Sequence, residues 1–303
     1  MTIEQLYTIF QQYPSVQTDT RALKEGDLFF ALKGPNFNAN QFAEKALAAG
    51  APYAVVDEAP AVPNDRIIVV KDTLDTLQQL AKHHRRQFNI PVIAITGSNG
   101  KTTTKELVHA VLSTTYKTYT TQDNLNNHIG VPLTILRIQK DAEMAVIEMG
   151  ANHQQEIASY CAYTLPTHGI ITNAGKAHLE GFGGEEGVRK GKGELYDYLR
   201  THEGTAFVMW DYHYLQTMSK GIPTIIKYGT IEADVTGQLF QSEPFLSVAI
   251  HATNPFTIQT QLVGAYNLPN VLVAVTIGKQ FNIEDNLIKR PLKIIPLPTV
   301  AHN

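Results

Sequence analysis

A glycine-rich segment that follows an apolar run carries the clearest chemical signal in the sequence. Residues 92–104 read Val-Ile-Ala-Ile-Thr-Gly-Ser-Asn-Gly-Lys-Thr-Thr-Thr, and apolar residues at helical spacing continue to Leu112. This pattern predicts a buried strand, a tight turn and a helix. The free backbone N–H groups at such a helix start, together with the helix dipole, favour a bound anion. The segment is therefore predicted to bind phosphate.

Two side chains of this phosphate loop suit nucleotide chemistry. Lys101 is expected to reach the outer phosphates, and the hydroxyl of Thr102 is expected to bind magnesium. The match to the full pattern is partial because Ile95 stands where its first glycine belongs, and an ordinary tight turn is the alternative. The Gly-Lys-Thr-Thr sequence after an apolar strand favours the phosphate loop. Its predicted nucleotide-binding residues are Gly97, Ser98, Asn99, Gly100, Lys101, Thr102 and Thr103.

Two residues that follow other apolar runs could contact a metal ion. Glu148 lies at the end of the run at 145–149, and a carboxylate there supplies the oxygen ligand that Mg²⁺ prefers. A solvated glutamate at the end of a strand is the alternative. His178 lies in the glycine-punctuated loop 173–184 and is a candidate for binding metal or phosphate, or else a structural histidine. Both residues are expected at the ligand-binding edge of the sheet.

Two polar segments leave their interpretation open. Residues 123–132 concentrate asparagines, which either bind a base or sugar or cap turns. Residues 187–196 are basic and include Lys192. Gly191 and Gly193 weaken the helix predicted there, which indicates that the backbone closely approaches another group. A solvated helix face is the alternative for this segment.

The composition favours a globular α/β protein. Hydrophobic residues make up 43% and charged residues 17% of 303 residues, a length that suits two or three domains. The net charge of −3 gives no electrostatic reason to expect nucleic acid or an acidic membrane surface. Cys161 is the only cysteine, so an intrachain disulfide is impossible and a reducing cytoplasm is expected. The N-terminus lacks the pattern of a signal peptide, and no apolar run is long enough to span a bilayer.

The first predicted domain is a small α/β domain at residues 1–88. Short apolar strands in it alternate with helices predicted at 2–12, 41–49 and 73–87. The last of these helices is expected to be capped by Thr73.

The second predicted domain spans residues 89–288 and begins with the phosphate loop. Its alternating strands and helices predict a mostly parallel sheet that is covered on both faces. Short alternating strands at about 233–262 predict a small antiparallel annex, and a final apolar helix follows at 264–280. Residues 289–303 show no periodicity and are predicted to be an irregular tail.

Several of these segments together resemble the Mur ligase family, the ATP-dependent enzymes that extend the peptide of the bacterial cell-wall precursor. The resemblance covers residues 15 to about 285. The segments that carry it are the phosphate loop, the asparagine segment, the start of the last helix and two stretches near the N-terminus: 96–103, 124–132, 264–270, 18–21 and 26–34. It implies that the first domain binds a uridine nucleotide and that the second is a phosphate-loop ATPase domain.

The resemblance also implies roles for individual residues. Asn267 and Asn270 are implied on the adenine side of ATP. Residues implied to bind the uridine-linked substrate are Thr20, Arg21, Lys33, Gly34, Asn124, Asn126 and Asn127.

The catalytic and metal-binding residues implied by the family are Lys101, Thr102, Glu148, His178 and Lys192. Lys101 would stabilise the transferring phosphoryl group, Thr102 and Glu148 would hold one Mg²⁺, and His178 would contact a second. Lys192 aligns with a lysine that the family carbamylates, and the resulting anion would bind the second Mg²⁺. Lys190 is an alternative for that role.

Two segments resemble the family member that adds D-alanyl-D-alanine to UDP-N-acetylmuramoyl-tripeptide: 148–152 and 172–183. The resemblance implies that ATP phosphorylates the terminal carboxylate of the tripeptide, that the amine of the dipeptide attacks the acyl phosphate, and that phosphate leaves. The expected cofactors are therefore ATP and two Mg²⁺ ions, the expected partners are the precursor and the dipeptide, and a monomer is expected. A sibling ligase that adds another amino acid, or a non-catalytic nucleotide-binding remnant, is the alternative.

The family has a third, Rossmann-like domain, which residues 289–303 do not resemble. We therefore expect a truncated or frameshifted gene product. Such a chain would bind the uridine-linked precursor and would ligate poorly, because closure by a further domain completes such a site and excludes water.

Overall fold

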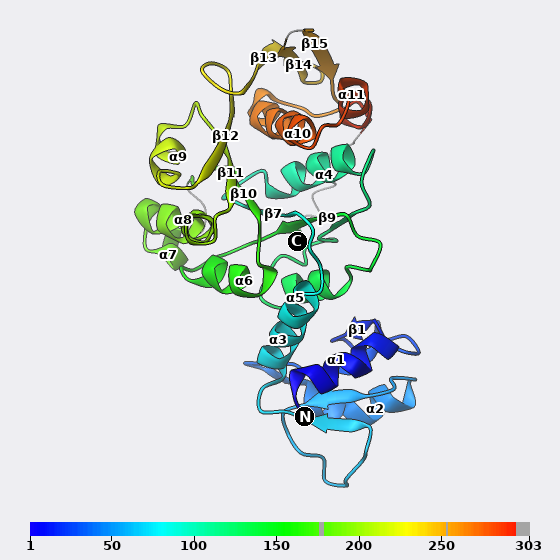
Figure 1. Cartoon of the computed structure of the whole chain (residues 1–303). Coiled ribbons are helices and arrows are strands. Elements are labelled where there is room, and N and C mark those ends of the chain that lie inside the picture. The colour runs from blue at the N-terminus through cyan, green and yellow to red at the C-terminus, as the bar shows by residue number, and fades with distance from the viewer. Residues whose placement is uncertain (176–178, 253, 295–303) are drawn as a thin grey trace. The chain divides into compact units, whose positions relative to one another are not determined.

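The computed structural model describes residues 1–175, 179–252 and 254–294, in two compact units (Figure 1). The first unit combines residues 1–89 with 128–139, and the second combines 90–127 with the residues from 140 onward. The sequence predicts two uninterrupted domains, but residues 128–139 belong to the first unit. The physical reason is that α5 (Gly130–Leu136) is buried along its whole length and packs on α3 (Thr73–Arg85) of that unit.

The first unit contains a four-stranded parallel sheet. Its strands pair in the order β1 (Val16–Gln17), β2 (Leu28–Phe30), β5 (Ala54–Val56) and β6 (Ile67–Val69). A two-stranded hairpin of β3 (Lys33–Gly34) and β4 (Phe37–Asn38) follows β2. The remaining helices of this unit are α1 (Ile3–Gln12), the 3-10 helix η1 (Ala39–Phe42) and α2 (Ala43–Ala48).

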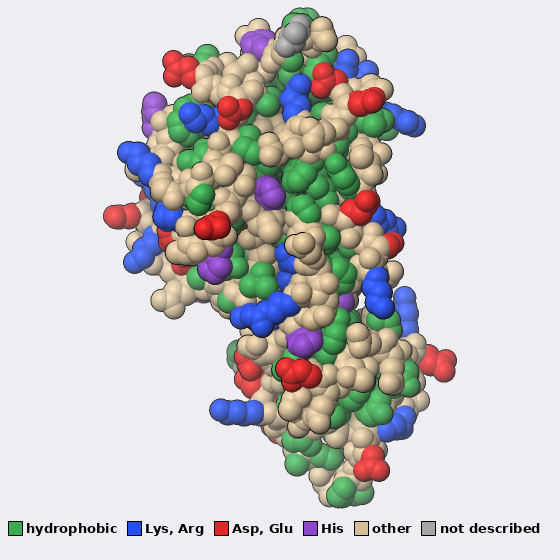
Figure 2. Space-filling view, in the orientation of Figure 1, with side chains coloured by type: hydrophobic (Ala, Val, Ile, Leu, Met, Phe, Trp, Pro, Cys, Tyr) green, Lys and Arg blue, Asp and Glu red, His purple; other side chains and the backbone are tan. Residues whose placement is uncertain are grey.

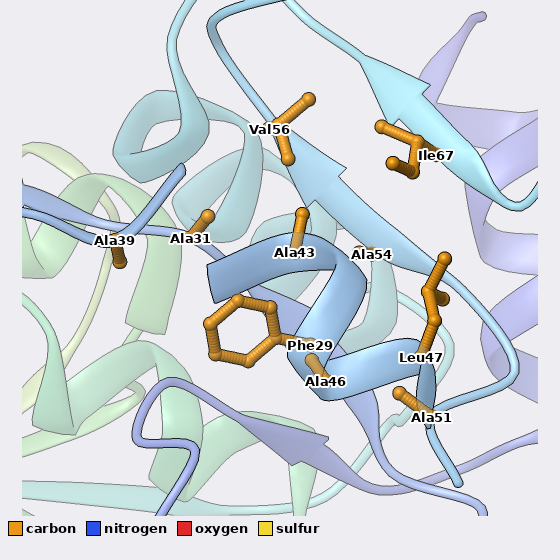
Figure 3. Packing of buried hydrophobic residues seen from close by; sticks show 10 residues of the cluster. All are labelled: Phe29, Ala31, Ala39, Ala43, Ala46, Leu47, Ala51, Ala54, Val56 and Ile67. Carbon is orange, nitrogen blue, oxygen red and sulfur yellow. The ribbon is translucent and has the colours of Figure 1, made fainter. Parts of the chain in front are cut away.

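Small side chains let α2 pack closely on this sheet. Ala43 and Ala46 of the helix are buried against Phe29 and Ala54 of the strands. Figure 3 shows the Phe29 ring beside Ala46, with Val56 and Ile67 on the neighbouring strands. Burial of this apolar surface stabilises the first unit.

Helix α3 begins where the sequence predicts, but its cap differs. Asp72, in extended conformation, accepts a hydrogen bond from the Asp75 N–H at 2.8 Å. The expectation that Thr73 caps the helix is therefore wrong, because Thr73 is the first helical residue and its hydroxyl is buried without a hydrogen-bond partner.

His84 of α3 ties together three segments of the first unit. Its Nε2 lies 2.8 Å from the Ile138 carbonyl oxygen, and its Nδ1 lies 3.0 Å from the Tyr7 hydroxyl. A carbonyl only accepts, so Nε2 carries the proton and Nδ1 accepts from Tyr7. The neutral ring is thus fully hydrogen-bonded, and burial lowers the pKa of His84.

The second unit contains a nine-stranded sheet. In spatial order its strands are β15 (Phe256–Gln259), β14 (Ser247–His251), β13 (Val235–Gln241), β12 (Thr224–Gly229), β11 (Thr205–Met209), β10 (His168–Ile171), β7 (Val92–Thr96), β9 (Met144–Glu148) and β8 (Thr118–Thr120). The strands from β13 to β8 are parallel, and β14 and β15 are antiparallel. The antiparallel strands extend the main sheet through the β12–β13 pair.

Helices cover both faces of this sheet (Figure 1). On one face α4 (Lys101–Leu112) packs against α10 (Leu268–Gln280), and on the other α6 (Glu156–Thr164) packs against α8 (Glu185–Thr201). The shorter helices of the unit are α7 (Leu179–Phe182), α9 (His213–Met218), η2 (Ala265–Asn267) and α11 (Asp285–Leu292).

The end of the chain is more regular than the sequence predicts. An irregular tail is expected from residue 289, but α11 continues to Leu292. The reason is that Ile288 and Leu292, one helical turn apart, are both fully buried. Residues 295–303 lie outside the described part of the chain.

The charges on the surface are mixed. Figure 2 shows basic and acidic side chains interspersed over the visible face. In the parts of the chain that the structure describes, no helix has both the length and the apolar character needed to cross a bilayer.

Acidification should destabilise the protein through His84. Its pKa lies below the ordinary value of 6.5, so the unfolded chain takes up a proton first as the pH falls. The stabilisation is therefore present above that ordinary value and is lost as the pH falls through the lower, folded-state pKa.

In His84→Gln, which does not titrate, the free energy of unfolding should be about 1–3 kcal/mol lower at neutral pH and should fall less on acidification. Urea unfolding followed by circular dichroism at about pH 7.5 and about pH 5 measures both effects. Equal pH dependence in the two proteins would contradict the assignment.

Candidate nucleotide and metal site

The phosphate loop joins β7 to α4, and its two glycines have backbone conformations that other residues rarely adopt. Gly97 has a φ of +145°, and a Cβ there would lie 2.0 Å from the Thr172 hydroxyl oxygen. Gly100 has a φ of +78° and is the N-cap of α4. The first turn of α4 therefore presents its backbone N–H groups at the carboxyl end of β7, as an anion site requires.

The loop is held from the side by the segment that follows β10. The Ser98 N–H donates to the Asn173 carbonyl at 3.0 Å, and the Asn99 N–H donates to Asn173 Oδ1 at 3.1 Å. The Thr172 hydroxyl donates to the Asn99 carbonyl at 2.6 Å. These contacts arise because β7 and β10 are parallel neighbours whose carboxyl ends meet. The sequence gives no sign of them, since they join segments more than seventy residues apart in the chain.

Lys101 lies folded back over the loop. Its ammonium donates to the Gly97 carbonyl at 2.8 Å and to the Ser98 carbonyl at 3.3 Å. Burial lowers the pKa of Lys101, and the negative charge of Glu148 opposes that effect. The side chain is thus positioned as a cation beside the space where phosphates are expected.

Glu148 carries the negative charge of the site. It is only 1% exposed at the end of β9, next to β7 in the sheet. Its Oε1 accepts hydrogen bonds from Asn126 Nδ2 at 2.8 Å and from the Thr102 hydroxyl at 3.2 Å. Its Oε2 is buried and has no hydrogen-bond partner. A buried carboxylate oxygen in this position calls for a cation.

This donor set fits the magnesium ion that the Mur ligase resemblance implies. Carboxylate and hydroxyl oxygens are hard ligands, and Mg²⁺ is usually bound through one or two carboxylates, with water and phosphate oxygens completing the set. Among residues 1–175, 179–252 and 254–294, no three His, Cys, Asp or Glu side chains form a metal-binding group. Glu148 and Thr102 supply one carboxylate and one hydroxyl, which suits an ion whose other ligands are water and phosphate oxygens.

The asparagine segment contacts this carboxylate. Asn126 donates to Glu148, and its carbonyl accepts the Gly150 N–H at 2.7 Å. A Cβ at Gly150 would lie 2.9 Å from Asn126 Oδ1, so the two segments fit closely. The exposed Asn124 accepts the Asn126 N–H with its own carbonyl at 2.8 Å, and Asn127 is also exposed. The Asn126 side chain thus positions the Glu148 carboxylate, a contact that neither open interpretation of this segment includes.

Lys192 of α8 is buried near the same edge of the sheet. Its ammonium donates to the Ala151 carbonyl at 2.9 Å and lies 5.0 Å from the centre of the Phe182 ring. Burial lowers the pKa of Lys192 to about 8, and the positive charge of Lys101 adds to the effect. His178, the other residue expected at this position, lies outside the described residues.

Gly191 explains how α7 packs on α8. A Cβ at Gly191 would lie 2.4 Å from the Phe182 ring, so the glycine makes room for the aromatic side chain that covers Lys192. Gly193 makes no such approach, because its nearest neighbour is the end of the Met218 side chain at 3.4 Å. The close approach expected for the two glycines is therefore present at Gly191 only.

A cavity of about 680 Å³ opens beside the phosphate loop. It lies between the loop, the segment after β11 and the start of α10, and it is lined by Gly100, Thr103, Asp211, Tyr212, Tyr266 and Asn267 among others. Its size and position suit a nucleotide whose phosphates lie on the loop.

Asn267 and Asn270 line this cavity, but their amides are engaged in a buried chain. The Thr104 hydroxyl donates to Asn270 Oδ1 at 3.0 Å, and Asn270 Nδ2 donates to Asn267 Oδ1 at 2.9 Å. Asn267 Nδ2 donates in turn to the Val263 carbonyl at 3.0 Å. The chain links α4 to the start of α10, so both residues shape the cavity wall.

The first unit has its own cleft, of about 520 Å³. Thr20 and Arg21 line it with the stacked rings of Phe37 and Phe42, whose centres are 5.7 Å apart. Arg21 pairs with Asp19 at 2.6 Å, and both side chains are exposed.

Lys33 and Gly34, which are also expected to bind substrate, form strand β3 of the hairpin. Lys33 makes ion pairs with Asp57 at 2.9 Å and with Glu58 at 2.8 Å, and Gly34 is exposed in β3. Lys33 is therefore bound to two carboxylates that hold the hairpin.

Comparison with known proteins agrees with this geometry. The profile of the Mur ligase middle domain matches residues 95–278, and that of the Mur ligase family, catalytic domain, matches residues 12–85. The chain belongs to the Mur ligase family. The middle-domain match contains the phosphate loop, Glu148 and Lys192, which the structure places in the second unit.

Several relatives of this Mur ligase are named UDP-N-acetylmuramoyl-tripeptide--D-alanyl-D-alanine ligase. That of Escherichia coli (strain K12) is 38% identical over 292 residues, which cover 92% of this chain and 62% of the relative. That of Bacillus subtilis (strain 168) is 37% identical over 271 residues, which cover 88% and 59%. The chain thus spans less than two thirds of the length of these relatives.

Solved structures of MurF have the same fold as this Mur ligase. A crystal structure of MurF from Acinetobacter baumannii gives a TM-score of 0.87 at 30% identity and covers 98% of this chain, which spans 69% of it. MurF from Thermotoga maritima in complex with ADP gives a TM-score of 0.81 at 28% identity, with coverage of 93% and 66%.

Removal of the Glu148 charge should weaken magnesium-dependent nucleotide binding. In Glu148→Gln the shape is kept but the cation loses its carboxylate, so ADP affinity in Mg²⁺ should fall about tenfold or more, equivalent to about 1.4 kcal/mol. In EDTA the variant should bind ADP at least as tightly as the wild type, because the anionic nucleotide no longer meets the Glu148 charge. Calorimetric titration measures both affinities, and Glu106→Gln, which lies on α4 and pairs with Lys105, is the matched control. An equal loss with and without Mg²⁺ would contradict a metal role.

The two glycines of α8 should respond oppositely to substitution. Gly191→Ala places a methyl group against the Phe182 ring and should cost about 1–3 kcal/mol of stability. Gly193→Ala meets no rigid neighbour, and it should stabilise the helix by about 0.5–1 kcal/mol. Thermal unfolding compares the two, and destabilisation by Gly193→Ala would show that the space beside it is filled.

Proposed function

We propose that this chain is part of an ATP-dependent ligase that adds D-alanyl-D-alanine to UDP-N-acetylmuramoyl-tripeptide in the synthesis of peptidoglycan precursor. The observation that carries the proposal is the buried Glu148 carboxylate beside a phosphate loop, with one oxygen held by Thr102 and Asn126 and the other without a partner. The two relatives described above are 37% and 38% identical to this chain, and their names support the assignment of the substrates. The ADP complex of a structural neighbour supports the nucleotide.

The cavity beside the phosphate loop would hold ATP, with Asn267 and Asn270 on the adenine side. Thr102 and Glu148 would hold one Mg²⁺, and His178 with Lys192 as a carbamate would hold a second. When bound, magnesium supplies positive charge that offsets the charge on the phosphate oxygens. The burial that lowers the pKa of Lys192 also leaves its amine more often neutral, which carbamylation requires.

The residues of this chain would act mainly by positioning and by charge. The terminal carboxylate of the tripeptide attacks the γ-phosphorus of ATP, and ADP leaves. The amine of the dipeptide then attacks the acyl carbon, loses a proton, and phosphate leaves as the peptide bond forms. The N–H groups of the loop and the Lys101 ammonium would stabilise the transferring phosphoryl group, in which such electrostatic effects dominate catalysis.

The first unit would bind the uridine nucleotide of the precursor. Its cleft offers stacked aromatic rings at Phe37 and Phe42, and the cationic side chains of Arg21 and Lys45. Aromatic faces suit a base, and cations suit a diphosphate. Thr20, Lys33 and Gly34 are further proposed substrate-binding residues of this unit. Asn124, Asn126 and Asn127 are proposed substrate-binding residues of the second unit. We also propose that the protein is a cytoplasmic monomer. Its single, buried cysteine suits a reducing compartment and supports the cytoplasmic location.

Selective binding of the precursor tests this function. UDP-N-acetylmuramoyl-tripeptide should bind at least about tenfold more tightly than the corresponding dipeptide precursor, because the added residue makes contacts worth about 1.4 kcal/mol. Calorimetry measures the two affinities, and ATP-dependent phosphate release with and without D-alanyl-D-alanine then tests turnover. Tighter binding of the shorter precursor would favour a sibling ligase. Failure to bind either precursor would contradict the ligase assignment.

A further inference from the structure

Tyr214 of α9 contacts the segment that supports the phosphate loop. Its hydroxyl oxygen accepts a hydrogen bond from the Ala174 N–H at 3.2 Å. Ala174 stands between Asn173, which holds the backbone of Asn99, and Gly175, whose carbonyl accepts the Ser98 hydroxyl at 3.1 Å. The Tyr214 hydroxyl therefore fixes the same short segment that supports the phosphate loop.

The ring of Tyr214 links this segment to two further parts of the site. It stacks on Tyr212 with ring centres 5.7 Å apart and planes 11° apart, and Tyr212 lines the 680 Å³ cavity. The guanidinium of Arg189 lies 5.2 Å from the centre of the Tyr214 ring. Arg189 precedes Lys192 by one turn of α8. Tyr214 thus contacts the wall of the cavity through Tyr212, the segment that supports the phosphate loop through Ala174, and α8 through Arg189.

We propose that Tyr214 is a positioning residue for the nucleotide site, acting through Ala174 on the phosphate loop. The proposal deepens the proposed function and rests on it for the identity of the nucleotide. Neither the loop pattern nor the family resemblance points to Tyr214, because it lies outside every motif of the sequence.

The physical argument concerns an amide that would otherwise lack a partner. Ala174 is 6% exposed, so its N–H is poorly placed to bond water when the tyrosine oxygen is absent. The segment at 173–175 would then shift to satisfy that N–H, and the hydrogen bonds that hold Ser98 and Asn99 would shift with it. Burial also raises the pKa of Tyr214, which keeps the hydroxyl neutral.

The test uses the full chain with ADP and Mg²⁺ as the probe. Tyr214→Phe removes only the hydroxyl. Tyr163→Phe is the matched control, because the Tyr163 hydroxyl is buried without a hydrogen-bond partner. Trp210 is the only tryptophan and adjoins Asp211 of the cavity wall, so its fluorescence reports nucleotide binding. Amide hydrogen exchange of the peptide that contains Ala174 reports the contact directly.

Tyr214→Phe should exchange faster at Ala174 and should bind ADP about two- to tenfold more weakly, the effect of one hydrogen bond. Tyr163→Phe should bind ADP like the wild type. A purely structural role of the Tyr214 hydroxyl would lower the unfolding temperature of Tyr214→Phe and leave its ADP affinity unchanged. Unchanged exchange at Ala174, or unchanged ADP affinity, would overturn the proposal. If the wild type fails to bind ADP, the proposed nucleotide site fails, and the exchange rate at Ala174 still decides the role of Tyr214.

Discussion

The second unit is arranged around one buried negative charge. A carboxylate that is 1% exposed is costly unless cations and hydrogen-bond donors surround it. For Glu148 these groups come from two segments. The start of α4 supplies the Thr102 hydroxyl and, at longer range, the Lys101 ammonium, and Asn126 before α5 supplies its side-chain amide. They meet because β7 and β9 are parallel neighbours in register, so that Ile95 pairs with Glu148. The unsatisfied Oε2 then leaves a place for a metal ion.

A site of this kind works only when its loop is held before the nucleotide arrives. Preorganised donors stabilise developing charge without paying for rearrangement during the reaction. Here the support comes from outside the phosphate loop, through Asn173 and the hydroxyl of the adjacent Thr172. Gly97 permits this contact, since any side chain at that position would collide with Thr172. The glycine is therefore needed for packing as well as for its backbone conformation.

Sequence alone predicts the features that depend on neighbouring residues. The strand, turn and helix around Lys101 depend only on residues near one another in the sequence, and so does the apolar strand that ends at Glu148. The structure contains them as β7, α4 and β9. Features that depend on distant segments escape such reasoning. The cap at Asp72, the burial of Ile288 that extends α11, and the contact between Asn126 and Glu148 are set by tertiary packing, which local patterns do not encode.

The asparagines at the start of α10 connect the wall of the cavity to α4 through their own side-chain amides. The amide of Asn270 lies between Thr104 and Asn267, and a Cβ at Gly100 would lie 3.0 Å from its Oδ1. The same side chain thus packs against the cap of α4 and anchors α10 to that helix. A shorter or apolar residue at 270 would leave the Thr104 hydroxyl unpaired in the interior, at a cost of about 1–3 kcal/mol. The hydrogen bonds of Asn270 to Thr104 and Asn267 thus fix the start of α10, and with it this wall of the cavity, against α4.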